Sequence, residues 1–228
     1  SLCIEGNRFI PVNLLDVAGL VPDAHKGKGL GNQFLNDLSQ ADVLIHIVDM
    51  TGSLDKSGNK IGEGQNDPIE DIRFLEDEID FWFKSIMERE DWGSFIREVK
   101  NKKQGFVDSI FNRLSGLKIN KKQIVEGLKR TNLKNKEPSS WTDDDRLIFS
   151  RSLRSISKPI IIAANKIDKE VSLDNLSVLK EKFRGIVIPC CALAERVLKD
   201  YHERGVINYM SGSSNFKIMD EEKLTQRE

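Results

Sequence analysis

The stretch Ile160–Asp168, which reads IIIAANKID, decides the fold class of this chain. Its five successive apolar residues predict a strand buried on both faces of a sheet, and Lys158-Pro159 breaks the chain just before them. Two other strand-sized apolar runs occur at Val43–Asp49 and Gly185–Pro189. The polar residues N-K-I-D follow the strand directly, at the end where parallel sheets carry their ligand-binding loops.

Segments with helical spacing separate these apolar runs. They are Gly31–Gln40, Leu173–Phe183 and Leu193–Tyr201. A further apolar run, Phe9–Asp16, predicts a strand near the start of the chain. Strands that alternate with helices indicate an α/β fold with a doubly wound, mostly parallel sheet.

The middle of the chain, residues 66 to about 157, contains no convincing strand. Asp67-Pro68 is typical of a helix start, and Thr142 is the expected cap of a later helix. Between them, apolar residues recur at alternating spacings of three and four, as in a helix that packs along another helix. They are Ile72, Leu75, Ile79, Trp82 and Ile86. We therefore expect a helical subdomain inserted at 66–157, between α/β segments at 1–65 and 158–210, with a linker or tail at 211–228.

Composition excludes several classes of protein. The 228 residues carry 35 basic and 36 acidic side chains, which argues against a protein that coats nucleic acid, and we expect no DNA partner. No apolar run approaches the roughly 18 residues of a membrane span. Three cysteines fit neither a disulfide framework nor a zinc site, so we expect a cytoplasmic protein.

Asp16-Val17-Ala18-Gly19 is a D-x-x-G motif placed just after the first predicted strand. An aspartate there can hold Mg²⁺ through water, and a glycine without Cβ lets its N–H approach a terminal phosphate. An ordinary strand-to-turn transition is the alternative, because the motif is common by chance.

Asn165-Lys166-Ile167-Asp168 is more specific. The Asp168 carboxylate can accept both the ring N–H and the exocyclic amine of guanine, a donor pair that adenine lacks. Asn165 would tie neighbouring loops together, and the Lys166 stem would lie against the base. The alternative is a polar turn with a helix cap.

Cys190-Cys191-Ala192 follows the last predicted strand. Small residues there let a backbone N–H meet the carbonyl oxygen of a base. Two buried cysteines at a strand end, or a strained vicinal redox pair, are the alternatives. By position, we expect His46 to be a packed strand residue and Asp49 to serve a turn or cap.

The three motifs, in this order and each after a strand, resemble those of a TRAFAC-class GTPase, which has a P-loop-NTPase-type fold. The stretch Asn7–Asn59 is similar to the Obg-related YchF group, in particular its archaeal type. The resemblance implies GTP and Mg²⁺ as ligands, slow GTP hydrolysis and association with the ribosome. The intact N-K-I-D motif implies guanine specificity.

The resemblance also assigns roles to residues. Asp16 would be linked to Mg²⁺ and Gly19 would contact the γ-phosphate, whereas Leu20 replaces the glutamine that commonly orients water. Gly19 and His25 are the candidate catalytic residues, and Gly27–Gly31 is similar to a nucleotide-sensing switch. The implied nucleotide-binding residues are Asp16, Gly19, Asn165, Lys166, Asp168, Cys191, Ala192 and Leu193.

The chain contains no G-x-x-x-x-G-K-[ST] motif, which cradles phosphates. We expect this motif upstream of Ser1 and a TGS domain beyond Glu228, so that the chain is a fragment with an incomplete sheet. We expect the fragment itself to bind nucleotide weakly.

Charge is segregated in the inserted segment. Asn66–Asp91 holds ten acidic and three basic residues, whereas Arg97–Lys136 holds twelve basic and three acidic ones. The resemblance makes the basic stretch a candidate RNA or partner surface, formed by Lys100, Lys102, Lys103, Lys118, Lys121, Lys122, Lys129 and Arg130. The alternative is that the basic helices merely pair with the acidic one. If the arm binds RNA or protein while the α/β part is only a scaffold, the chain would be a non-catalytic binding module.

Overall fold

The computed structural model describes residues 2–4, 6–17, 37–55, 58–89, 91–101, 105–183 and 185–220. The chain divides into two compact units. Unit 1 comprises residues 1–44 and 74–159, and unit 2 comprises residues 45–73 and 160–228. Within the described ranges, no helix combines the length and apolar character needed to cross a bilayer.

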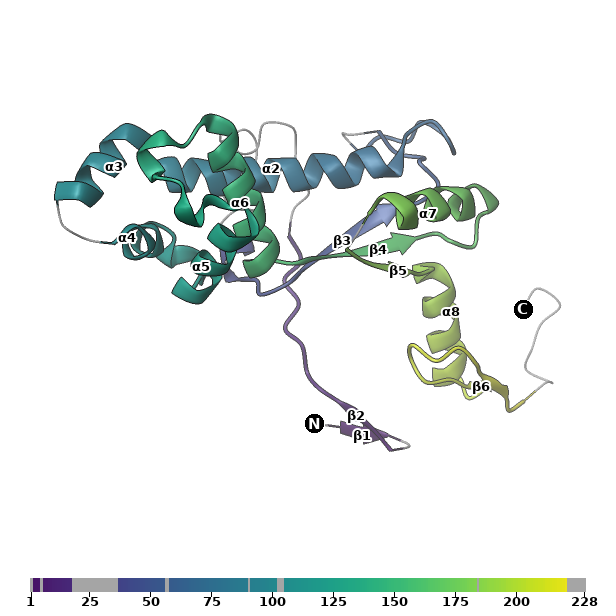
Figure 1. The fold of residues 1–228 in the computed structure, drawn as a ribbon. Helices are drawn as coiled ribbons and strands as arrows, with labels where there is room; N and C mark the ends of the chain where they lie inside the picture. Colours follow the sequence, from purple (N-terminus) through teal and green to yellow (C-terminus); the bar gives the residue numbers. More distant parts are fainter. Residues whose placement is uncertain are drawn as a thin grey trace. The chain divides into compact units, whose positions relative to one another are not determined.

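The sheet of three strands confirms the predicted α/β class. Its strands are β3 (Leu44–Asp49), β4 (Ile160–Asn165) and β5 (Ile186–Pro189), in the order β3-β4-β5. Strands β4 and β5 are parallel. The N–H of Leu44 donates to Pro159 O at 2.9 Å, and the N–H of Met50 donates to Asn165 O at 3.1 Å. Strand β3 therefore runs beside β4 in the same direction, and the two strands begin and end at the same level. Helices α7 (Glu170–Lys182) and α8 (Ala192–Glu203) follow β4 and β5, as Figure 1 shows.

Only part of the sheet is buried. Ile162 and Ala164 of β4 are fully buried, and so is Leu179 of α7. We expected β3 to be buried on both faces, and this prediction is wrong: Ile45 and Ile47 are 56% and 68% exposed. Side chains alternate across a strand, and the described residues cover only one of the two faces.

The C-terminal part of unit 2 folds back on α8. The strands β6 (Ile207–Asn208) and β7 (Lys217–Ile218) pair antiparallel, and Tyr209 Oη donates to Glu195 Oε2 of α8 at 2.6 Å. Residues 211–216 lie in the connection between these two short strands, where glycine and serine are common, and the linker or tail expected at 211–228 stays a prediction. Residues 221–228 lie outside the described part.

The N-terminal segment departs from the prediction. Strands β1 (Leu2–Ile4) and β2 (Asn7–Phe9) form an antiparallel hairpin, but residues 10–17 are irregular. Ile10, Val12 and Leu14 are about three-quarters exposed. The predicted strand at Phe9–Asp16 is therefore wrong beyond β2, since no described strand pairs with 10–17 and an unpaired strand leaves its backbone unsatisfied.

Unit 1 contains the helices of the middle segment, and the described residues between 66 and 157 include no strand. The helices are α2 (Pro68–Glu88), α3 (Trp92–Asn101), α4 (Phe106–Arg113), α5 (Lys121–Arg130) and α6 (Asp143–Ser157). Three 3-10 turns accompany them: η2 (Ser115–Leu117), η3 (Leu133–Asn135) and η4 (Pro138–Ser140). The first six residues of α2 belong to unit 2. The boundaries of an inserted domain stay a prediction.

Local signals explain where these helices begin. Asp67 Oδ1 accepts from Ile69 N at 2.8 Å, directly before Pro68 opens α2. Thr142 Oγ1 accepts from Asp145 N at 3.2 Å, and Asp145 returns the bond to Thr142 N, so a capping box starts α6. Along α2, Ile79 and Trp82 of the predicted apolar seam are buried.

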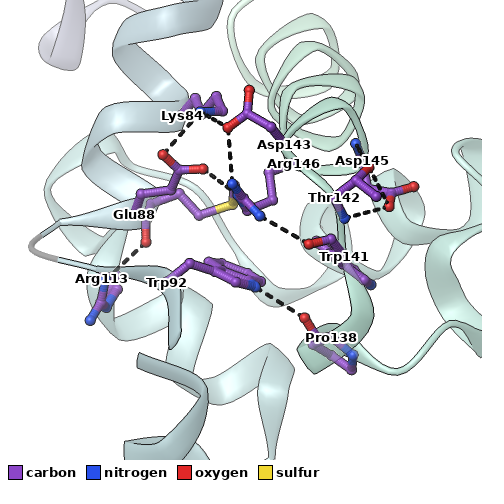
Figure 2. Close-up of polar contacts among 11 residues, drawn as sticks. Lys84, Glu88, Trp92, Arg113, Pro138, Trp141, Thr142, Asp143, Asp145 and Arg146 are labelled. Carbon is purple, nitrogen blue, oxygen red and sulfur yellow. Dashed lines mark hydrogen bonds and ion pairs between the residues drawn. The ribbon is translucent and has the colours of Figure 1, made fainter. Parts of the chain in front are cut away.

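Polar contacts join α6 to the C-terminal end of α2, as Figure 2 shows. Arg146 forms ion pairs with Glu88 and with Asp143, and Lys84 pairs with the same two carboxylates. Beneath them, the rings of Trp92 and Trp141 stack with centroids 5.5 Å apart, and Trp92 Nε1 donates to Pro138 O. The aromatic core of the helical unit is therefore closed by a charged layer.

A second contact between α2 and α6 is buried. Arg154 Nε donates to Asp80 Oδ1 at 2.9 Å, and the two side chains are 8% and 3% exposed. The guanidinium also reaches Glu76 at 3.3 Å. Burial raises the pKa of Asp80 despite this partner. The acidic helix α2 thus pairs with arginines of α6. From the basic stretch, Arg97 forms an ion pair of 4.0 Å with Asp91, which follows the end of α2.

Candidate functional site

Three loops meet at the edge formed by the carboxyl ends of β3, β4 and β5. Backbone hydrogen bonds join them: Met50 N donates to Asn165 O at 3.1 Å, and Ile167 N donates to Cys190 O at 3.4 Å. The chain thus brings the predicted motifs after β4 and β5 together, beside the end of β3. All three loops belong to unit 2.

The Asn165 side chain connects two of these loops. Its Oδ1 accepts from the N–H of Ala192 at 3.0 Å, where α8 begins. The short amide side chain at the end of β4 therefore fixes the start of the helix after β5. This hydrogen bond connects two neighbouring loops, as we expected of Asn165 from the sequence.

Asp168 presents an exposed carboxylate at this edge. A hydrogen bond from the Cys191 side chain lowers the pKa of Asp168, so the carboxylate stays ionised at neutral pH. Cys191 is also the N-cap of α8, where its Sγ accepts from Ala194 N at 3.4 Å. The thiol thus acts both as a donor to Asp168 and as the cap of α8.

The first N–H groups of α8 differ in whether they have a hydrogen-bond acceptor. Those of Ala192 and Ala194 are bound to Asn165 and Cys191. In the described part of the chain, the N–H of Leu193 has no hydrogen-bond acceptor. Because helix N-termini offer donors to acceptors on ligands, Leu193 rather than Ala192 holds the available donor at the start of α8.

Lys166 extends toward the end of β3. Its backbone has φ 64°, in the left-handed region, and its Nζ donates to Asp49 Oδ2 at 2.8 Å. Asp49 also accepts from Thr51 and Ser53, so it serves a turn as predicted. Its contact with Lys166 was not predicted, because the sequence does not say which strand lies beside β4. The sequence offered one signal for this contact, namely an acidic residue at the end of an apolar run.

The other predicted site residues come from the N-terminal part of the chain and from β3. Asp16 is exposed in the irregular segment of unit 1. Gly19, Leu20, His25 and the glycine-rich stretch Gly27–Gly31 lie outside the described residues. His46 is a packed strand residue, as predicted: burial lowers its pKa to about 4.

No group of three or more His, Cys, Asp or Glu residues able to hold a metal occurs within the described ranges. A single exposed carboxylate such as Asp16 still suits Mg²⁺, because this ion keeps several waters and takes further oxygens from substrate phosphates.

The predicted basic surface is partly neutralised. Lys121 pairs with Asp108 at 2.6 Å and Arg130 with Glu126 at 3.0 Å, while Lys100 lies 3.7 Å from Glu137. Lys118 Nζ donates to Gln40 O at 2.8 Å. Lys122 and Lys129 are exposed and form no ion pair in the described part of the arm. Lys102 and Lys103 lie outside the described residues.

A parallel sheet with polar loops at its carboxyl edge is consistent with an α/β fold of P-loop type. The fold is similar to the crystal structure of a GTP binding protein from Pyrococcus horikoshii OT3, with a TM-score of 0.68 and 38% identity over 78% of this chain and 51% of that one. Residues 163–228 match the family described as Obg-like GTPase YGR210-like, G4 motif-containing domain, and residues 3–76 match the 50S ribosome-binding GTPase family. Over these residues the chain is similar to Obg-like and ribosome-binding GTPase families.

Individual relatives show the same similarity. An uncharacterized GTP-binding protein of Methanocaldococcus jannaschii is 41% identical over the whole chain and 56% of its own length. Another from Schizosaccharomyces pombe is 34% identical over 96% of the chain and 53% of its own length. Obg-like ATPase 1 of Rattus norvegicus is 27% identical over 70% of the chain. The chain spans about half the length of the first two relatives.

Proposed function

We propose that this chain supplies the base-recognition half of a guanine nucleotide site in a YchF-type GTPase. One observation carries the proposal: the ionised, exposed carboxylate of Asp168 is hydrogen-bonded to Cys191, the N-cap of the helix whose Leu193 N–H is unused, on loops that Asn165 holds together. Two relatives bear the description of GTP-binding proteins, which supports GTP as the ligand.

Guanine and this edge are complementary. Asp168 would accept the ring N–H and the exocyclic amine, and Leu193 N–H would donate to the ring carbonyl. Adenine has a ring acceptor in place of the ring N–H and lacks the neighbouring exocyclic amine, so both hydrogen bonds to the Asp168 carboxylate would go unmade. Hydrogen bonds to charged groups contribute about 1.5–3 kcal/mol each, and two such bonds give strong discrimination.

The residues for phosphate chemistry would come from the N-terminal part of the chain. Asp16 would hold Mg²⁺ through water, and the ion would neutralise charge on the phosphates during GTP hydrolysis. Gly19 would contact the γ-phosphate. Leu20 cannot orient a water molecule, so that role would fall to another group, for which His25 is a candidate. We propose a cytoplasmic location for the protein.

The substitution Asp168→Asn tests the base assignment, with Asp174→Asn on the exposed face of α7 as the matched control. Guanosine binding to the 228-residue chain, followed by NMR, should be lost in the first variant and unchanged in the second. Guanosine that binds Asp168→Asn as well as it binds the original chain would show that Asp168 is not the base acceptor.

A second candidate function is binding to ribosomal RNA through the arm. The family matched by residues 3–76 is described as ribosome-binding, and Lys122 and Lys129 leave uncompensated charge on α5. Lys122→Glu combined with Lys129→Glu should abolish co-sedimentation with ribosomes, because phosphate contacts dominate such binding. Lys180→Glu on α7 is the control. Undiminished co-sedimentation of the double variant would exclude this surface.

A further inference from the structure

Asp49 is bound more extensively than a turn residue requires. Its Oδ1 accepts from the N–H of Thr51 at 3.0 Å and from the hydroxyl of Thr51 at 2.6 Å. Its Oδ2 accepts from Ser53 Oγ at 2.6 Å and from Lys166 Nζ at 2.8 Å. The carboxylate is only 11% exposed, so these four donors fix its position from both sides.

The hydrogen bonds also fix its charge. They lower the pKa of Asp49 to about 2 against the opposing effect of burial. The group is therefore ionised across the physiological range, and a permanent counterion stands at the end of β3 beside the β4 loop.

Lys166 is held at both of its ends. Its main chain occupies the left-handed region at φ 64°, and its carbonyl accepts from Lys169 N at 3.2 Å. Its ammonium group is anchored on Asp49, while the side chain remains 45% exposed. The methylene stem between these anchors is thus fixed in position yet open to a ligand.

We propose that Asp49 is a positioning residue of the base site, which holds the stem of Lys166 in place as a preformed wall for a purine ring. The proposal rests on the function proposed above and adds to it the loop after β3, Asp49–Ser53. Since the Lys166 ammonium is already paired within the protein, the lysine acts on the base through its stem rather than by meeting a phosphate. Preorganisation of this kind raises affinity by lowering the ordering cost of binding.

The variant Lys166→Met separates the apolar stem of Lys166 from its ammonium group. Methionine keeps an unbranched apolar side chain but cannot form the ion pair with Asp49. Asp49→Asn removes the charge of the other partner. The matched control is Asp55→Asn, in the next turn of the same loop, where Asp55 binds Asn59 at 2.8 and 3.0 Å.

Guanosine titrations of the full chain, followed by two-dimensional NMR with adenosine as the comparison ligand, test the proposal. We expect Lys166→Met and Asp49→Asn each to weaken guanosine binding about fivefold, as for loss of one charge-assisted contact. The double variant should be no weaker than Lys166→Met, because Asp49 acts through the lysine. Asp55→Asn should bind like the original chain.

The outcomes that would overturn the proposal are distinct. Unchanged binding by Lys166→Met overturns it even if Asp49→Asn does not fold. Losses that multiply in the double variant would assign Asp49 an independent role in the turn. If the original chain fails to distinguish guanosine from adenosine, the base site itself is refuted, and the positioning role falls with it.

Discussion

The substitution Arg154→Met is predicted to weaken the helical unit strongly, because it breaks the buried pair with Asp80. Both side chains are less than a tenth exposed, with Nε and Oδ1 2.9 Å apart. Removing one partner of such a pair costs about 3–5 kcal/mol. Arg151 still lies 3.4 Å from Asp80 Oδ2, so we expect about 3 kcal/mol, at the lower end.

The loss should depend on pH. Burial already raises the pKa of Asp80, and removal of its main cationic partner would raise it further. A carboxyl group whose pKa is higher in the folded than in the unfolded state binds its proton more tightly when folded. Acidification from pH 7 toward pH 5 should therefore restore part of the stability that the variant lost.

Urea unfolding followed by tryptophan fluorescence measures this effect, since all three tryptophans lie in unit 1. With a slope of about 2 kcal/mol/M, the midpoint should fall by about 1.5 M at pH 7. Arg130→Met, which removes an exposed pair on α5, is the control and should cost about 0.5 kcal/mol or less. A midpoint for Arg154→Met within the range of this control, or one that falls equally at both pH values, would refute the reasoning.

Three further changes have defined outcomes. Thr142→Ala removes the cap of α6 and should cost about 1 kcal/mol in the same assay, whereas an unchanged midpoint would show that the cap is dispensable. Lys158→Met should cost about 2 kcal/mol, because the buried ammonium donates to the carbonyls of Ser39 and Ala41; stability equal to that of the original chain would contradict this. Asn165→Ala removes the acceptor of the Ala192 N–H, so hydrogen exchange of this amide should accelerate, and an unaltered rate would argue against the tie between the two loops.

Local signals in the sequence were sufficient for much of the fold. The apolar run after Pro159 became β4, and Asp67-Pro68 and Thr142 mark the starts of α2 and α6. These features depend on neighbouring residues in the chain. Burial depends on what lies across the sheet, which explains why Ile45 and Ile47 are exposed although their strand looks like an interior one.

Contacts between distant segments were harder to predict. The strand proposed at Phe9–Asp16 has the right composition, yet its apolar pattern cannot provide a pairing partner. Strands of two residues such as β6 and β7 are too short to show a periodicity. The contact between Asp49 and Lys166 follows only from the strand order, which places the end of β3 next to that of β4.

The most direct test of the central claim is a map of guanosine-induced shifts in the amide spectrum of the original chain, compared with those from adenosine. We predict guanosine shifts concentrated at Asp168 and Leu193, in the loops after β4 and β5, and no comparable shifts with adenosine. Equal responses to both nucleosides, or guanosine shifts confined to other parts of the chain, would contradict a guanine site at this edge.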